Sequence, residues 1–135
     1  MNQDIQKELE ILWSEFDEND VNEKLAAFKR LKAVSTRSDL PQLINAIESE
    51  RNDFWTRELL SDPISDLGGV DYLPELFDAL EKNQDEGHDN DGFCHHLTEI
   101  ASADPAACKR KLQELISADG FGHKDTARWL LEFCE

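Results

Sequence analysis

The sequence predicts an all-α protein in which about eight helices pair into about four antiparallel hairpins and stack in a single domain, residues 1–135. Residues 40–48, beginning Leu40-Pro41, return 33 residues later as residues 73–81, beginning Leu73-Pro74. In both copies the apolar residues fall at i, i+3, i+4 and i+7, which places them on one face of a helix. A helix that recurs at this interval is typical of stacked helical repeats, which usually act by presenting a surface to a partner.

The first four helices follow from apolar spacing and from capping residues. A first helix over about 3–18 has the apolar stripe Ile5, Leu9, Leu12 and Phe16. A second, opened by an Asp20 cap, has the stripe Val21, Leu25, Phe28, Leu31 and Val34. The third is the first copy of the repeated segment, opened by Asp39, and tolerates Pro41 in its first turn. The fourth is capped by Asn52 and runs from Phe54 to about Ser61, because Pro63 cannot continue the backbone ladder.

The last four helices follow a break at Gly68 and Gly69. The fifth is the second copy, over about 71–82. The sixth begins near Asp91, which caps it, and turns Phe93, Leu97 and Ile100 inward. Asp104 and Pro105 open the seventh, with Cys108, Leu112, Leu115 and Ile116 inward, and Gly120 and Gly122 end it. The eighth runs from about Lys124, with Ala127, Leu130, Leu131 and Cys134 at helical spacing.

The starts of two alternate helices also repeat. Asn52-Asp53-Phe54 opens one and Asn90-Asp91-Gly92-Phe93 opens the other, 39 residues on, so residues 83–92 hold an insertion of six. An early proline, a short turn with an Asp and a second apolar helix together resemble HEAT-type repeats, most clearly over about residues 39–103. The resemblance implies a right-handed superhelix whose second helices line the concave face.

Charge is the outstanding feature of the composition. Lys and Arg number 14 against 30 Asp and Glu, a net charge of −16. Residues 61–104 hold 12 of the acidic side chains and one basic residue, Lys82, whereas residues 105–135 hold five of each. The excess is either an acidic patch or a bland solubilising charge. Either repels phosphate backbones and anionic lipids, so we expect no nucleic acid and no membrane as partner, and a basic protein face instead.

The three cysteines indicate a reducing compartment. Cys94, Cys108 and Cys134 are odd in number and fall on apolar helix faces, as small hydrophobic residues do. The first residues lack the basic start and apolar run of a secretory signal. No window approaches the ~20 apolar residues of a membrane span. We therefore expect a soluble, cytoplasmic protein.

Two sequence patterns suggest a metal-binding site. With Gly92 at the sixth position of an EF-hand loop, Asp89 and Asp91 take the third and fifth, but Gly87 and Thr98 fall where the first and last ligands are needed. A solvated acidic loop is the alternative interpretation. Cys94, His95 and His96 cannot all face one zinc ion, because adjacent helical residues point about 100° apart.

No catalytic arrangement is apparent. Cys94 and His95 are neighbours in sequence, which does not bring their side chains together as a nucleophile and its base. The chain has no Gly-flanked Ser or Cys turn and no Gly-rich phosphate loop. We expect no enzyme, no catalytic or metal-ligating residues and no cofactor.

Three tryptophans remain. Trp13 is assigned to the core. Trp55 and Trp129 either pack between repeats or lie on the concave lining, where aromatic anchors dominate binding energy. The predicted partner-binding residues are Asp53, Trp55, Glu58, Asp85, Glu86, Asp89, Asp91, His95, Glu99 and Trp129.

The sequence therefore favours a monomeric protein–protein interaction module. The chain is similar to small acidic bacterial immunity proteins of polymorphic toxin systems, which implies binding and occlusion of a cationic toxin domain through the acidic surface. The alternative is a housekeeping scaffold or adaptor that holds a peptide or an enzyme subunit in an apolar groove. Charge reversal at Asp85, Glu86, Asp89 and Asp91 separates the two.

Overall fold

The computed structural model describes residues 2–134 and is helical throughout its regular secondary structure, so the all-α prediction is confirmed. Short 3-10 turns, Arg37–Asp39 and Gly69–Tyr72, precede α3 and α5. The α-helices are α1 (Gln3–Trp13), α2 (Val21–Val34), α3 (Leu40–Ile47), α4 (Phe54–Gly68), α5 (Leu73–Asp85), α6 (Asp91–Ala103), α7 (Pro105–Ser117) and α8 (Lys124–Leu131).

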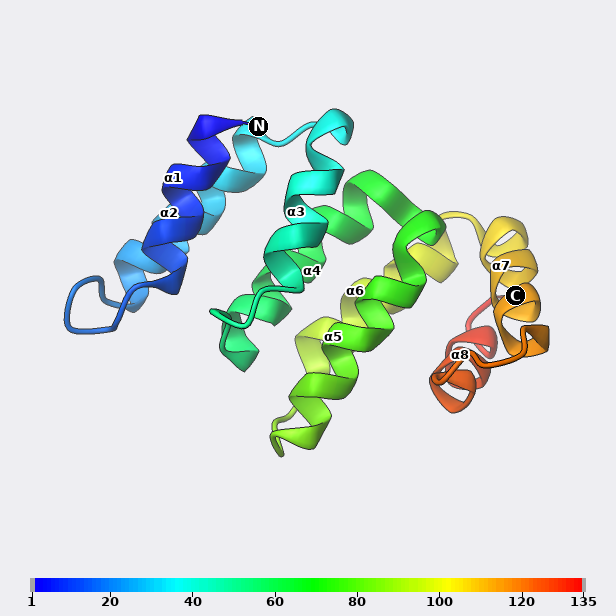
Figure 1. Ribbon diagram of the computed structural model, residues 1–135. Helices are drawn as coiled ribbons and strands as arrows, with labels where there is room; N and C mark the ends of the chain where they lie inside the picture. Colours follow the sequence, from blue (N-terminus) through cyan, green and yellow to red (C-terminus); the bar gives the residue numbers. More distant parts are fainter. Residues whose placement is uncertain (1, 135) are drawn as a thin grey trace.

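The first six helices lie in two rows (Figure 1). α1, α3 and α5 form the nearer row of the figure, and α2, α4 and α6 lie behind them. α1 packs on α2, α3 on α4 and α7 on α8, while α4 also contacts α5 and α6. The loops that follow α1, α3 and α5 lie along one edge of the molecule, the lower edge in Figure 1. We call residues 14–20, 48–53 and 85–91 the turn edge.

One hydrophobic cluster runs through the stack, from Ile5 in α1 to Cys134 after α8. Leu43 and Leu76, which occupy equivalent positions in the two copies of the repeated segment, are both 0% exposed. Both copies therefore bury the face that their apolar spacing predicts.

The N-terminal helices differ from the sequence-based expectation. α1 ends at Trp13, and Phe16, placed in its stripe, is 50% exposed on the following loop. Asp20 caps α2 as predicted, but Val21 is 48% exposed, and the deepest positions of α2 are Lys24, Ala27 and Leu31. The face was misassigned because Lys24 is polar in sequence, whereas in the fold its ammonium donates to the main-chain carbonyls that end α1.

The prediction for α4 had the correct start, Phe54, but the wrong capping residue and the wrong end. Asp53, not Asn52, caps the helix by accepting from the Thr56 amide at 2.7 Å. The helix then continues through Pro63 to Gly68, whose successor Gly69 adopts a positive φ of 54°. A proline inside a helix removes one amide donor, and Pro63 is buried, so its packing offsets that loss.

The α5–α6 connection is shorter than predicted. α5 begins at Leu73, after the 3-10 turn that contains Asp71, and it extends to Asp85. The loop expected at residues 83–92 is therefore only residues 86–90. Asn90, not Asp91, is the N-cap of α6, and its side chain makes no capping bond. Asp39 likewise bonds back to Thr36 in the 3-10 turn and makes no side-chain cap to α3. Asp104 caps α7 as predicted.

Candidate partner-binding surface

The turn edge concentrates negative charge. It holds eleven acidic residues and one basic residue, Arg51. Arg51 is itself neutralised by Glu10 of α1, at 2.8 Å. Among residues 2–134, the only carboxylate of the turn edge that pairs with a basic side chain is that of Glu86, which binds Arg57. Residues 24–38 show the opposite bias, with five basic residues and no acidic one. The excess charge is thus localised.

Two of the predicted partner-binding residues, Asp53 and Glu58, accept hydrogen bonds from amides at the starts of helices. Asp53 caps α4, as described above. Glu58, on the next turn of α4, reaches α6, where its Oε1 accepts from the Phe93 amide at 3.1 Å. A carboxylate at this position satisfies an amide that the helix itself leaves free, and it lies at the positive end of the helix dipole.

Gly92 makes the approach of Glu58 possible. A Cβ atom at position 92 would lie 2.9 Å from the Glu58 Oε1 atom, closer than real Cβ contacts. The glycine in the repeated Asn-Asp start of α6 is thus a packing residue for a carboxylate on another helix.

A buried polar network that sequence reasoning missed supports the middle of the turn edge. Arg57 is 8% exposed, donates to the Asn83 Oδ1 atom at 2.8 Å and pairs with Glu86. Asn83 in turn donates to the Phe54 carbonyl at 3.1 Å. Glu86, which the sequence predicts as a partner-binding residue, therefore also stabilises the fold through its ion pair with Arg57. The one feature of the sequence that could have indicated this network is Arg57, a charged residue in a helical turn whose other residues face inward.

Asn52 performs a second structural role. Its side-chain nitrogen lies 2.7, 3.1 and 3.0 Å from the carbonyls of Ala46, Ile47 and Ser49, which end α3. Its side-chain oxygen accepts from the indole of Trp13 at 2.6 Å. Trp13, assigned to the core, indeed packs against it, and Arg51 lies over its outer face.

The carboxylates at the start of α6 raise the pKa values of their neighbours. Asp89 accepts from the Asp91 amide at 2.9 Å, and the hydrogen bond and charge of Asp89 raise the pKa of Asp91. Burial, followed by the charges of Asp91, Asp89 and Glu58, raises the pKa of Cys94. A thiol held protonated in this way is a poor nucleophile.

His95 and His96 point to different surroundings. His95 pairs with Glu99 one turn further on, at 2.5 Å, and both side chains are exposed. His96 instead faces α4, with Nδ1 2.6 Å from the Ser61 hydroxyl. Burial lowers the pKa of His96, partly opposed by the carboxylates of Asp62, Glu99 and Glu58.

The Ser61–His96 contact has the geometry of a structural hydrogen bond. Ser61 is 0% exposed, and its hydroxyl lies 2.6 Å from the Glu58 carbonyl, to which it donates. Since the hydroxyl has a single proton, His96 must donate Nδ1–H to the serine oxygen. Nε2 of His96 then carries the lone pair and can accept a hydrogen bond.

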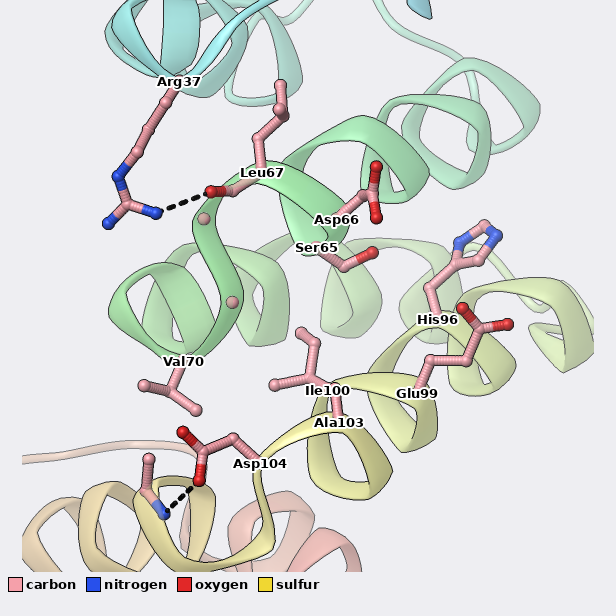
Figure 2. A pocket seen from close by; sticks show the side chains of 13 residues that line it. Arg37, Ser65, Asp66, Leu67, Val70, His96, Glu99, Ile100, Ala103 and Asp104 are labelled. Atoms are coloured by element: carbon pink, nitrogen blue, oxygen red, sulfur yellow. Dashed lines mark hydrogen bonds between the residues drawn. The ribbon is translucent and has the colours of Figure 1, made fainter.

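A hollow of about 360 Å³ opens beside His96, between the C-terminal part of α4, α6 and the start of α7. Figure 2 shows Asp66, Glu99 and Asp104 around it, with Val70, Ile100 and Ala103 between them. Arg37 lies at its far side, where its guanidinium donates to the Leu67 carbonyl at 2.9 Å. Three carboxylates around an apolar floor suit a cationic group with an aliphatic stem. Glu99 is one of the predicted partner-binding residues; Asp66 and Asp104 are not among them.

The remaining predicted residues are spread over the molecule. Asp85 is exposed at the end of α5, beside a hollow of about 240 Å³ shared with Glu48 and Glu75. Trp55 is half-buried and stacks on Phe16, with ring centroids 6.2 Å apart. Trp129 lies on α8, at the other end of the molecule, against Phe133. The structure thus does not join the two tryptophans in one lining.

Within residues 2–134, no three His, Cys, Asp or Glu side chains are grouped so that they could hold a metal ion. No helix in that range combines the length and the apolarity that crossing a bilayer requires. Cys94, Cys108 and Cys134 are free thiols, two of them buried. The chain matches no protein-family model, no curated protein and no solved structure.

Proposed function

We propose that this protein is an interaction module whose turn edge, together with the adjoining face of α4 and α6, binds the basic face of another protein. The observation that carries the proposal is the localisation of charge. Eleven carboxylates crowd three neighbouring loops with a single basic side chain among them. A field of this kind attracts a cationic surface and accelerates its encounter.

Helix stabilisation does not account for this density of charge. An acidic side chain at the N-terminus of α2, α4 or α6 is favourable, and Asp20, Asp53 and Glu58 fill that role. The same edge also holds the C-termini of α3 and α5, where the dipole disfavours acidic residues. Glu48 and Asp85 stand there nevertheless, without a salt bridge to any residue in the described range 2–134. Carboxylates kept at an unfavourable end support a role outside the fold.

In its most concrete form, the proposal is an immunity protein that occludes the substrate-binding cleft of a cationic toxin, such as a nuclease domain. The support for this form is the likeness of a small, acidic chain of HEAT-like helical pairs to such proteins. The two rows of helices fit a repeat stack of this type, and we propose that α4 and α6 line its inner face. A monomer that binds one basic partner and uses no cofactor is the form expected.

The test uses the protein as bait in a lysate of its native cell, followed by kinetics with the purified binding partner. The recovered protein should be basic, and its on-rate should fall about tenfold or more between low and high salt. An on-rate that is flat across the same range, or an apolar partner held independently of salt, would overturn the electrostatic mechanism and favour a scaffold with an apolar groove.

A pair of charge-matched variants locates the surface. The turn-edge variant combines Glu15→Gln, Asp17→Asn and Asp85→Asn, three exposed residues without a salt bridge. The control combines Glu114→Gln, Asp119→Asn and Glu132→Gln, which are equally exposed on α7 and after it. Both variants lose three negative charges. Only the turn-edge variant should slow association markedly; equal effects of the two would reduce the role of charge to the net value and reject the proposed surface.

A further inference from the structure

An aromatic surface lies exposed within the acidic turn edge. Phe16 and Val21, at the two ends of the α1–α2 connection, are 50% and 48% exposed. The Phe16 ring stacks on Trp55 at the start of α4, with an angle of 25° between the ring planes. The α1–α2 loop and the first turn of α4, which are distant in sequence, therefore present a pair of stacked rings at the surface.

The buried side chain of Lys24 supports the Phe16 ring from the interior of the protein. Lys24 is 2% exposed, and its ammonium donates to the Leu12 carbonyl at 3.2 Å and to the Ser14 carbonyl at 2.5 Å. The same ammonium lies 4.0 Å from the centroid of the Phe16 ring. Burial of a lysine is unfavourable unless its donors are satisfied, and here two carbonyls and a ring face satisfy them.

The loop itself is ordered by its own hydrogen bonds. The Asn19 side chain donates to the Ser14 hydroxyl at 2.9 Å, and the Asn19 amide donates to the Glu15 carbonyl at 3.0 Å. A large apolar ring that is held outward by a bonded loop loses little conformational entropy when it is covered. Such pre-organisation is typical of a binding anchor.

The chemistry around the ring selects the occupant. The two loops that flank the ring pair hold five acidic residues outside any salt bridge of the described chain, of which Asp20 and Asp53 each accept one helix amide: Glu15, Asp17, Glu18, Asp20 and Asp53. A guanidinium group can lie flat on an aromatic face and donate to carboxylates at its edge at the same time.

The molecule already contains this arrangement once. Arg51 lies over the Trp13 ring, 4.4 Å from its centroid, and donates to both carboxylate oxygens of Glu10, at 2.9 and 2.8 Å. At Phe16 the buried Lys24 ammonium covers the inner face of the ring, and the exposed part of the Phe16–Trp55 pair has acidic loops beside it but no arginine from the described part of the chain.

We propose that the Phe16–Trp55 face receives an arginine side chain from a basic segment of the partner protein. This inference rests on the proposed function and names the anchor of the interface. The aromatic face supplies stacking area, and Asp17 and its neighbours supply acceptors for the guanidinium hydrogens. Phe16, Val21 and Asp17 stand outside the predicted site, which was drawn from residues 53–129.

The experiment titrates the whole protein with a glycine–arginine repeat peptide of about a dozen residues, by calorimetry and by NMR of the aromatic rings. The control peptide carries citrulline, which keeps the planar side chain without its charge. We expect the arginine peptide to shift the Phe16 and Trp55 ring signals and the citrulline peptide to leave them unchanged. Phe16→Ala should weaken binding by about three- to tenfold, and Phe16→Leu, which keeps apolar bulk, should recover only part of that loss.

Phe133→Ala is the matched control, because Phe133 is 45% exposed and also contacts a tryptophan, Trp129. It should leave the affinity unchanged. If Phe16→Ala and Phe133→Ala weaken binding equally, or if neither does, the anchor is rejected. Loss of binding in the turn-edge charge variant with normal binding in Phe16→Ala rejects the anchor and retains the proposed function. Normal binding in both rejects the two together.

Discussion

Asn52 joins three parts of the molecule, and its replacement tests the packing of the turn edge. The residue is 7% exposed. Its amide serves the carbonyls that end α3, and its oxygen serves the indole of Trp13 in α1. Asn52→Ala removes all of these partners without adding bulk, so the loss reports the hydrogen bonds themselves.

The magnitude follows from the number of protons available. The Asn52 amide has two hydrogens, so at most two of the three carbonyls are fully bonded at once, and the indole adds a third bond. At about 1 kcal/mol for each net hydrogen bond, Asn52→Ala should lower the free energy of unfolding by about 3 kcal/mol. For a chain of this size that corresponds to a fall in Tm of roughly 10 °C. Asn52→Asp should be worse, since it turns a carboxylate oxygen towards the α3 carbonyls.

Urea unfolding followed by tryptophan fluorescence measures both variants. Asn45→Ala is the control, because Asn45 lies exposed on α3, the helix whose last carbonyls Asn52 bonds, and it should stay within about 0.5 kcal/mol of the wild type. A loss for Asn52→Ala as small as that of the control would refute the assigned hydrogen bonds. A greater stability for Asn52→Asp than for Asn52→Ala would refute the orientation of the amide.

Three further predictions concern α6 and its neighbours. In a Glu58→Ala background, Gly92→Ala should raise the free energy of unfolding by roughly 0.5 kcal/mol, because alanine favours the helix. In the wild type, the same substitution should raise the free energy of unfolding by less, or lower it, because the new Cβ atom displaces Glu58. Equal effects of Gly92→Ala in the two backgrounds would argue against the bond from Glu58 to α6. Burial lowers the pKa of His96, so the folded protein holds that proton less tightly than the unfolded chain, and the stability contributed by neutral His96 is complete above about pH 6.5 and is lost as the pH falls. The stability of the wild type relative to His96→Gln should therefore decline from about pH 7.5 to about pH 5 in urea titrations, and a constant difference would contradict this. At about pH 8, Cys94 should react with iodoacetamide several-fold more slowly than glutathione does, because the pKa of its thiol is raised. Burial raises the pKa of Cys108 to about 12, so Cys108 should react only after unfolding. Mass spectrometry measures the labelling of the two cysteines separately.

Local sequence signals predicted the elements that depend on local physics. The repeated segments at 40–48 and 73–81 bury the expected leucines because four residues per face suffice to define a stripe. Asp20 and Asp104 cap their helices because the acceptor lies next to the amides that it serves. These parts needed no knowledge of the neighbouring helix.

The errors arose where the deciding partner is distant in sequence. Pro63 continues a helix because core packing outweighs one lost amide bond. Lys24 lies inward because two carbonyls at the end of α1 receive its ammonium. The side chain that satisfies an amide at the start of α6 is Glu58, 35 residues before the amide that it bonds. None of these partners can be identified from helical periodicity.

The candidate surface was predictable in kind and only partly in place. Counting charges along the chain identified residues 61–104 as acidic, and Asp85, Asp89 and Asp91 do lie on the turn edge. The loop at 14–20 lies outside the predicted site because residues 1–60 as a whole carry a net charge of only −5, with the basic residues of α2 offsetting much of their negative charge. Only the stack brings that loop beside the start of α4.

The bond from Glu58 to the Phe93 amide ties the order of α6 to the order of α4. Should α4 unravel, the first turn of α6 loses its acceptor, so amide hydrogens on both helices should exchange with solvent in one shared opening event. At the other end, α8 meets α5 through His123, which lies between Asp78 and Glu81. The Glu58 bond, by contrast, makes α4 and α6 hold each other in place.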